Sequence, residues 1–468
     1  MSDGQASPVF AWPDIVLDLV DLVEGEPSVY LVGGAVRDAL LRRPIRDVDL
    51  IATGGGRRLA RRIADAWKGD YYPLDADRDV GRALIDTPNG RILVDVAGLR
   101  ADDLDADLRD RDFTINAMAV QLSGGLDSLA DPLGGLRDLR AKRLRHCSPA
   151  SITNDPIRAV RAVRISAQFG LRIEPDTLRA VRDGVSLLGR VSPERVRDEF
   201  IQLLSLPKPV SALRILRGVG LLSVIVPALA GLRDSAWDQT VLTVERTADL
   251  IRTIGPERTD ETAAQFALGM VVMALDRYRA QLNDHLLASR STGRTQKSLL
   301  VLASLLATLG PIDAGQVGRK FKLSADECQW LEATLAALPG ALELREPDAL
   351  ALHRYWRTAG AAGIDALLLA LASTLARQGV ALDQDAWVRQ LEAARLLLWA
   401  WFDRHDTLVE PPPLVTGNQL MTALRLRPGP AVGRLLDQLR EAQVTGVITT
   451  PDAALELAAE LLEQDQAD

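Results

Sequence analysis

The first hundred residues alternate between short apolar runs and polar turns, which predicts a small sheet with helices packed on it. Two glycines follow the first apolar run, and residues 36–41 then carry apolar side chains at helical spacing. A second helix is expected at 57–67, and Pro88-Asn89-Gly90 is a hairpin signal. Strands are expected at five places: 28–32, 48–51, 70–74, 81–86 and 91–96.

The rest of the chain has a helical pattern. Residues 155–169 are expected to form a helix with Pro156 at its first position, and Ser192-Pro193-Glu194 is a good helix start. Beyond it, apolar stretches at helical spacing are separated by Pro and Gly. We therefore predict an α+β fold, with a head built on a small mixed β-sheet followed by all-α domains. The expected boundaries are 24–140 for the head, 141–205 for the neck, 206–330 for the body and 331–468 for the tail.

Length and composition narrow the class of protein. A chain of 468 residues is too long for a single core. The longest apolar run, residues 219–232, is short for a membrane span and contains Pro227, and the N-terminus lacks the features of a signal peptide. Cys147 and Cys328 lie far apart, which suits free thiols and excludes a cysteine-based zinc cluster. We expect a cytoplasmic protein with no membrane partner.

Gly33 and Gly34 end the first strand and open a candidate phosphate site. Glycines let the backbone approach a triphosphate closely, and the N–H groups that open a helix are unpaired. Arg37 would lie in the first helical turn, close enough to hold phosphate oxygens. Asp47 and Asp49 are two residues apart on the next strand, so both carboxylates leave one face and offer the hard oxygen ligands that Mg²⁺ prefers. Either motif alone is a weak signal, but together they are coherent with two-metal phosphoryl transfer.

A third carboxylate, Asp95, lies between Val94 and Val96 in the last of the expected strands. A lone carboxylate in an apolar strand needs a partner. A metal shared with Asp47 and Asp49 would supply one. The alternative is an edge strand on which Asp95 faces water.

Positive charge is concentrated in one segment of an acidic chain. The net charge is −8, which argues against indiscriminate nucleic-acid binding, yet residues 137–172 hold nine Arg and Lys against two Asp. We predict that Arg140, Lys142 and Arg143 bind an RNA backbone. A solvated basic helix face is the alternative.

Four charged residues form a stripe on the helix expected at 155–169. Asp155, Arg158, Arg161 and Arg164 recur at every third residue, so the stripe drifts around the helix and cannot face one small ligand. A nucleotide at one end, with an RNA backbone or a domain contact at the other, would use the whole stripe. Surface arginines beside a buried face are the alternative.

Together the motifs resemble the class II tRNA nucleotidyltransferase and poly(A) polymerase family, whose members extend RNA 3′ ends without a nucleic-acid template. The resemblance covers residues 29–204, and the tail segments LVTGNQLM and GPAVGRLLDQLREAQ are similar to the C-terminal part of bacterial members. The ordered motifs are LVGGAVRDALL with DVD, RDFTINAMA, DPLGGLRDL, NDPIRAVRAVRISAQFGLRIEP and SPERVRDEF.

The resemblance assigns a role to each motif of the head, a nucleotidyltransferase-type catalytic domain. Gly33, Gly34 and Arg37 would contact the triphosphate. Asp47 and Asp49 would hold the catalytic metals, and Asp95 falls where the family has a strand carboxylate near them. Further nucleotide-site residues that match the family are Arg111, Asp112, Asn116, Arg161 and Arg164.

The resemblance also implies how a base is selected without a template. Asp155 and Arg158 match the family pair that reads the base edge of CTP or ATP. A carboxylate acceptor beside a guanidinium donor can pair with the amino group and ring nitrogen that cytosine and adenine share. The same pair rejects the reversed pattern of uracil and guanine.

Two positions depart from the family pattern. The family's usual Glu before the base-reading Asp is Asn154 here, so one carboxylate of that motif is missing. The segment 97–110 is short, whereas members that add a full CCA usually have a longer flexible loop there, which they need to switch from C to A addition. A short loop is a feature of the CC-adding subgroup and of some poly(A) polymerases.

The resemblance therefore implies a template-independent RNA nucleotidyltransferase that adds CMP and AMP from CTP and ATP to the 3′ end of tRNA. Mg²⁺ would be the cofactor, and the tRNA acceptor end, CTP and ATP the partners, with no obligate protein partner. A poly(A) polymerase and a CC-adding enzyme are the alternatives. A catalytically inactive RNA-binding scaffold is remote, because it predicts the loss of a carboxylate and Asp47, Asp49 and Asp95 are all present.

Overall fold

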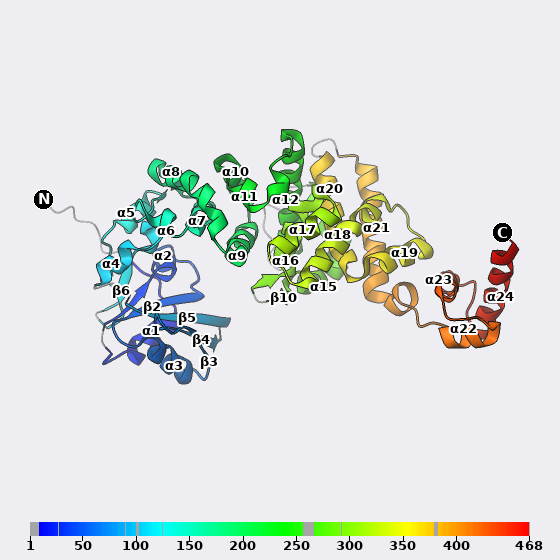
Figure 1. The fold of residues 1–468 in the computed structure, drawn as a ribbon, viewed down its shortest axis with the longest axis horizontal. Helices are drawn as coiled ribbons and strands as arrows, with labels where there is room; N and C mark the ends of the chain where they lie inside the picture. Colours follow the sequence, from blue (N-terminus) through cyan, green and yellow to red (C-terminus); the bar gives the residue numbers. More distant parts are fainter. Residues whose placement is uncertain are drawn as a thin grey trace. The chain divides into compact units, whose positions relative to one another are not determined.

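The computed structural model describes residues 9–26, 28–88, 90–99, 103–123, 125–255, 266–291, 293–378 and 382–467. The chain divides into two compact units. Unit 1 comprises Met1–Glu199 and Ile215–Val224, and unit 2 comprises Phe200–Arg214 and Ile225–Asp468 (Figure 1). The predicted α+β class, with a sheet-containing N-terminal part and a largely helical remainder, is confirmed. The four boundaries of head, neck, body and tail stay predictions.

Unit 1 contains a seven-stranded mixed sheet in the order β3-β4-β5-β2-β1-β6-β7. Strands β2 and β5 run parallel, and the other neighbours are antiparallel. The five predicted strands are present, while β6 and β7 were not predicted. Asn89, in the predicted hairpin turn, lies outside the described residues. The strands are β1 (Val29–Val32), β2 (Asp47–Ala52), β3 (Asp70–Asp75), β4 (Val80–Thr87), β5 (Gly90–Gly98), β6 (Ala119–Gln121) and β7 (Leu129–Ala130).

Helix α3 (Gly56–Ala66) covers one face of this sheet, below it in Figure 1. Its buried Leu59, Ala60 and Ile63 supply the apolar face that the sequence pattern requires. At Gly81 a Cβ would lie 2.8 Å from the Cβ of Ala60, so a glycine permits this close packing. The opposite face of β2, β4 and β5 carries the polar side chains.

The other helices of the N-terminal part range from the 4 residues of α6 to the 13 residues of α7. The predicted helix 155–169 begins only at Ile157, and Asp155 has an extended backbone after the short helix α6, so the predicted start was wrong. Asp155 therefore lies at a bend and not on a helix face. These helices are α1 (Asp14–Leu22), α2 (Gly34–Leu40), α4 (Leu104–Arg109), α5 (Gly135–Arg140), α6 (Ser151–Asn154), α7 (Ile157–Phe169), α8 (Pro175–Asp183), α9 (Pro193–Leu204), α10 (Val210–Val219) and α11 (Leu221–Ile225).

Unit 2 is built around α20 (Gly363–Gln378), which is buried over most of its length and packs against α12 and α18. Among the described residues, Ala349–Gln378 is long and apolar enough to cross a membrane, but 89% of its apolar window is buried inside the protein. Burial of that kind is a property of a core helix. The surrounding helices are α12 (Asp234–Ile254), α14 (Phe266–Leu275), α15 (Arg279–Leu287), α16 (Gln296–Leu306), α17 (Pro311–Lys320), α18 (Ala325–Glu343), α19 (Ala349–Ala359) and α21 (Gln384–Asp403).

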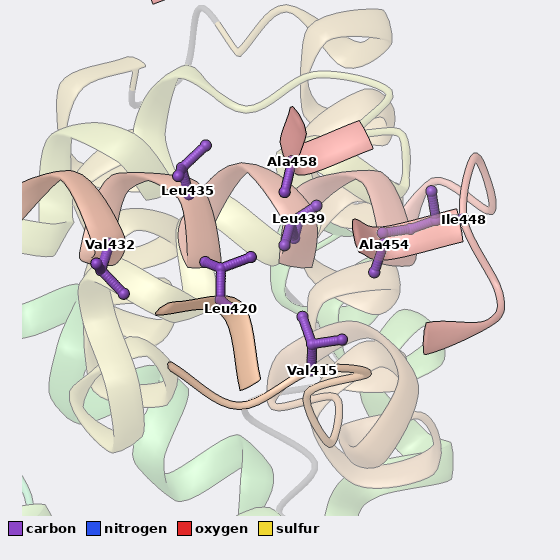
Figure 2. Packing of buried hydrophobic residues seen from close by; sticks show 8 residues of the cluster. All are labelled: Val415, Leu420, Val432, Leu435, Leu439, Ile448, Ala454 and Ala458. Atoms are coloured by element: carbon purple, nitrogen blue, oxygen red, sulfur yellow. The ribbon is translucent and has the colours of Figure 1, made fainter. Parts of the chain in front are cut away.

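The last three helices of unit 2 enclose an apolar cluster of their own (Figure 2). They are α22 (Gly417–Leu424), α23 (Pro430–Val444) and α24 (Pro451–Ala467). Leu420, Leu435, Leu439 and Ile448 are its largest buried members. The Arg354 guanidinium on α19 donates two hydrogen bonds, of 2.8 and 2.7 Å, to Glu441 on α23 and so joins the cluster to the preceding helices.

Candidate active site

Asp49 belongs to a row of charged side chains that crosses the sheet. It pairs in register with Asp95 of the parallel strand β5, and Asp95 pairs with Arg82 of β4. The side chains of residues paired in register on neighbouring strands point to the same face of the sheet. Asp47 points to that face too, because it is two residues from Asp49 on the same strand. The face is opposite the one where Ala83 is buried under α3. The predicted carboxylates Asp47, Asp49 and Asp95 are thus brought to one surface.

Asp95 has a protein partner, which the sequence did not predict. The Arg82 guanidinium donates to both of its carboxylate oxygens, with Nε–Oδ1 at 2.7 Å and Nη2–Oδ2 at 2.8 Å. Strand β5 lies between β4 and β2, so the alternative of an edge strand was wrong. The hairpin signal could have identified Arg82, because counting outward from the turn places it opposite Asp95.

Gly33 brings the backbone close to Asp49 and Arg111. Its φ of 75° lies in the left-handed region, and a Cβ there would be 3.1 Å from both Arg111 Nη1 and Asp49 Oδ2. A side chain at this position would therefore be strained and would crowd two candidate site residues. Arg111 also pairs with the buried Asp107 at 3.5 Å.

Nearby arginines compensate the charges of Asp47 and Asp49 only in part. Burial, with the nearby Asp95 and Asp47 carboxylates, raises the pKa of Asp49 to about 6 against the opposing effect of Arg111. Burial and Asp95 also raise the pKa of Asp47. Across the ranges that the structure describes, neither carboxylate accepts a hydrogen bond or forms an ion pair.

This donor set fits a magnesium ion. Mg²⁺ is usually held by one or two carboxylates together with substrate phosphates, and not by a full protein cage. The described part of the chain contains no group of three or more His, Cys, Asp and Glu side chains that could hold a metal. Two unpaired carboxylates on one strand face match this kind of site, so Asp47 and Asp49 are the residues that would hold the metal.

Arg37 is enclosed by protein groups. Its Nη1 donates to Asn116 Oδ1 at 2.6 Å, and its Nε and Nη2 donate to the Asp38 carboxylate at 3.0 Å. The guanidinium lies 4.2 Å from the ring centre of Phe169, and a Cβ on Gly34 would approach its Nη2 to 3.3 Å. Direct contact of Gly34 and Arg37 with a triphosphate stays a prediction.

A polar network continues from Asn116 into the helices. The Asn116 amide donates to Asp112 Oδ1 at 3.0 Å, and Arg161 donates to Asp112 Oδ2 at 3.2 Å. Burial opposes ionisation of Asp112, but Arg161, Asn116 and the Phe113 N–H hold its pKa below the usual value. On α9, Glu199 accepts from both Arg161 and Arg164. Arg161 and Arg164 thus bind a carboxylate of α9 in this structure, and their contact with a nucleotide stays a prediction.

Asp155 and Arg158 line a cleft of about 1150 Å³ beside the ends of β2 and β5. Arg195 of α9 reaches the same cleft and donates from Nη2 to Asp155 Oδ2 at 2.8 Å. Arg158 Nε is 3.9 Å from that oxygen. The two predicted base-reading residues are brought together, and a second arginine lies beside them.

Family models match three parts of the chain. Residues 29–145 match the poly(A) polymerase head domain, 170–232 the probable RNA and SrmB-binding site of polymerase A, and 294–459 the tRNA nucleotidyltransferase domain 2. The chain is 33% identical to a CC-adding tRNA nucleotidyltransferase of Geobacter sulfurreducens, over 90% of this chain and 89% of the relative. It belongs to the class II tRNA nucleotidyltransferase and poly(A) polymerase family.

The relatives of this transferase differ in the nucleotide that they add. An A-adding tRNA nucleotidyltransferase of Deinococcus radiodurans is 30% identical over 92% of this chain and 94% of the relative. Among solved structures, a CCA-adding enzyme with CTP has a TM-score of 0.62 and 20% identity, over 97% of this chain and 96% of the other. The Thermotoga maritima CCA-adding enzyme complexed with tRNA has a TM-score of 0.56 at the same identity and coverage. At this identity the likeness concerns the fold.

The three predicted RNA-binding residues of the transferase differ in exposure. Arg140 and Lys142, at the end of α5, are exposed. Arg143 donates to the fully buried Asp138 at 2.8 Å, and Arg145 pairs with the same carboxylate. Arg143 therefore has a structural partner, which makes Arg140 and Lys142 the better candidates for RNA contact.

Sequence reasoning assigned no role to Arg195 or Glu199, although both lie in the quoted motif SPERVRDEF. They are four residues apart on α9, so they share one face, and that face meets the charged residues at and beyond the start of α7. The spacing was visible in the sequence. The partners were not, because the pairing depends on how the transferase places α9 beside α7.

Proposed function

We propose that the protein adds cytidines, and not the terminal adenosine, to the 3′ end of tRNA. The proposal chooses the CC-adding alternative over full CCA addition. Its support is the short connection between β5 and Arg111, the segment whose longer form the family needs to switch from C to A. The similarity to a CC-adding relative over nearly the full length of both chains also favours it.

The main support for CC addition is that helix α4 lies within the connection between β5 and Arg111 and is anchored there. Only five residues separate Gly98, the end of β5, from Leu104, the start of α4. The Asp103 side chain caps the helix through the Ala106 N–H at 2.8 Å, and Leu108 is fully buried. Residues 100–102 lie outside the described residues. A capped helix anchored by the buried Leu108 leaves little chain that could rearrange between the two bases.

The residues of the chain have separable roles in the reaction. The 3′ hydroxyl of the RNA attacks the α-phosphate of CTP, a new P–O bond forms, and the bond to pyrophosphate breaks. Mg²⁺ bound by Asp47 and Asp49 would supply Lewis-acid activation of the hydroxyl and charge compensation on the triphosphate. Arg111 beside Asp49 is positioned to stabilise negative charge, and Asp155 offers a carboxylate acceptor to the base.

The test is to incubate the protein and Mg²⁺ with tRNA lacking its CCA end, and separately with tRNA ending in CC. CTP alone, ATP alone and both together are supplied, and the product ends are sequenced. We expect two cytidines from CTP and no adenosine on tRNA ending in CC. Addition of a complete CCA, or of a long adenosine tail, would overturn the proposal.

An A-adding enzyme is the second candidate, because the Deinococcus relative covers the chain equally well. It would extend only the tRNA that already ends in CC, and only with ATP. The same six reactions therefore separate the two candidates. An inactive scaffold would extend neither RNA.

A further inference from the structure

The row of charged side chains on the polar face of the sheet ends in a tyrosine. The row runs from Asp49 to Asp95 and Arg82, which are register partners on β2, β5 and β4. Arg82 pairs in register with Tyr72 of β3, the edge strand of the sheet. The side chains of register partners point to the same face, so Tyr72 lies on the face that carries the carboxylates.

The neighbouring Tyr71 points to the other face. The guanidinium carbon of Arg61 on α3 lies 4.4 Å from the centre of its ring, and a Cβ on Gly81 would be 3.1 Å from its Cε2. Tyr71 therefore packs against α3, whereas Tyr72 is 47% exposed on the opposite surface. In the described part of unit 1, Tyr72 is the one exposed aromatic side chain.

The direction of the transfer reaction brings the RNA to the side of the carboxylates on which Tyr72 lies. Gly33, part of the predicted triphosphate site, directly follows Val32, which pairs with Asp49 from the β1 side. Strand β5 flanks Asp49 on the other side, followed by β4 and β3. In phosphoryl transfer the attacking and leaving oxygens are roughly in line. Pyrophosphate that leaves toward Gly33 therefore requires a 3′ hydroxyl that approaches from β5, β4 and β3.

We propose that Tyr72 stacks on a base near the 3′ end of the RNA and so holds the acceptor strand across β5, β4 and β3. The inference rests on the proposed reaction, because Gly33 and the carboxylates define its direction, but it does not depend on which nucleotide is added. Three strand spacings of about 4.8 Å separate Asp49 from Tyr72, a distance of about 14 Å. A stacked nucleic-acid strand rises about 3.4 Å per nucleotide, so the base lies within about four nucleotides of the reacting hydroxyl.

Stacking suits this position better than a phosphate contact. The face carries Asp47, Asp49 and Asp95, and the Arg82 guanidinium is already bound to both oxygens of Asp95. Every base has a π-face, so an aromatic ring accepts any sequence. That tolerance is needed here, because each added nucleotide moves a different base to a fixed distance from the metal site.

The test uses tRNA lacking its CCA end in which one of the last four nucleotides is abasic. Extension is measured with CTP, or with ATP on tRNA ending in CC if the protein adds adenosine. In wild-type protein, one abasic position should lower kcat/KM for the RNA by about five- to a hundredfold, the range of a base–aromatic stack. Tyr72→Ala should lower kcat/KM for the intact RNA by a similar factor and should lose the penalty at that position.

The adjacent tyrosine supplies the matched control. Tyr71→Ala should keep the abasic penalty, because that ring faces α3, and Tyr71→Leu replaces it if the variant does not fold. Tyr72→Phe keeps the ring and should also keep the penalty. The effect of Tyr72→Ala should appear in KM for the RNA, with kcat unchanged, because the stack is remote from the reacting atoms. The penalty is a ratio within one preparation, so it does not depend on the fraction of active protein.

Three results would overturn the proposal. Wild-type protein could show no penalty at any of the four positions, or Tyr72→Ala could keep every penalty. The third is a fall in kcat with KM for the RNA unchanged, since Tyr72 would then act through Arg82 and Asp95. Failure of the proposed function looks different, because wild-type protein would then extend no RNA with either nucleotide.

Discussion

Two carboxylates of this chain have pKa values shifted in opposite directions. Asp49, on the polar face of the sheet, has a pKa raised to about 6 by burial and by its carboxylate neighbours. Glu327, at the start of α18, is also removed from water, but the Arg294 guanidinium, the Ser291 hydroxyl and the Ser324 N–H outweigh burial and lower its pKa to about 2. The two Arg294 contacts are 2.7 and 3.2 Å long.

The difference shows that the fold compensates the charge of Glu327 far more fully than that of Asp49. Glu327 completes a capping box with Ser324 and an ion pair with Arg294, so its ionised form stabilises unit 2. Asp49 receives no comparable partner from the described chain, which is consistent with its proposed role as a ligand of an external cation. Charge that is compensated only in part lowers stability, and it is typical of a site that a ligand completes.

The largest effect is expected from removing these partly compensated carboxylates. Asp49→Ala or Asp47→Ala should lower kcat for nucleotide transfer by on the order of a thousandfold or more, because a ligand of the catalytic metal is lost. Binding of tRNA should change little. Single-turnover transfer and filter binding measure the two quantities. Activity within about tenfold of wild type at saturating Mg²⁺ would contradict the metal assignment.

Much of the head could be predicted because its signals are local. The alternating pattern identified five strands, and the two-residue spacing of Asp47 and Asp49 placed them on one face. Asp95 joined them only through the parallel register of β2 and β5, which neither strand reveals alone. The seven-stranded order was equally hidden, since β6 enters the sheet beside β1 after a long excursion of the chain.

The neck was predicted less well because its charges pair across the fold. The sequence grouped Asp155 with Arg158, Arg161 and Arg164 by spacing. In the structure the first lies at a bend and binds Arg195, and the last two share Glu199. The partner of a long, flexible side chain depends on the tertiary structure around it. The three-residue spacing could therefore show that these side chains point in different directions, but it could not show which residue each one binds.

A second prediction tests the compensated side of the comparison. Glu327→Gln should lower the free energy of unfolding by about 3 kcal/mol near pH 7, because the ion pair is lost and Arg294 stays buried. The wild-type contribution is present above the unfolded pKa of 4.5 and is lost as pH falls toward 2. Denaturant titrations at several pH values measure both effects.

The exposed pair of Glu332 with Arg319 supplies the matched control. Glu332→Gln should cost well under about 1 kcal/mol, because solvent screens such pairs. Equal losses in the two variants would mean that burial of Glu327 brings no special stability.

A third prediction has the reverse sign. The pKa of Asp49 is raised from 3.8 to about 6 in the folded protein, so the folded state favours the protonated carboxyl. The stability that this preference contributes is fully present below about pH 4 and is lost as pH rises through 6. Asp49→Asn should therefore raise the free energy of unfolding by about 2 kcal/mol near pH 8 without metal, and by little near pH 4. Chelator-treated protein in denaturant titrations tests this. A variant no more stable than wild type near pH 8 would show that the charge of Asp49 is compensated after all.

The smallest effect concerns Arg140 and Lys142, the exposed charges beside the sites compared above. Each phosphate that they neutralise contributes about 0.7–0.9 to the salt slope of RNA binding. Replacing both by Gln should weaken tRNA binding a few-fold and flatten the slope by about 1–2, while KM for CTP stays unchanged. Arg143 is left intact, because its loss would strand the buried Asp138 and confuse stability with binding.

The control for this double variant changes the net charge equally at another exposed place. Arg182→Gln with Arg190→Gln removes two positive charges outside residues 137–172. If the basic segment attracts the RNA directly, the control should keep the wild-type slope, because counterion release depends on the phosphates contacted and not on net charge. If both variants keep that slope, the RNA path runs elsewhere on the protein. If both flatten it, the attraction is a diffuse field of the whole surface.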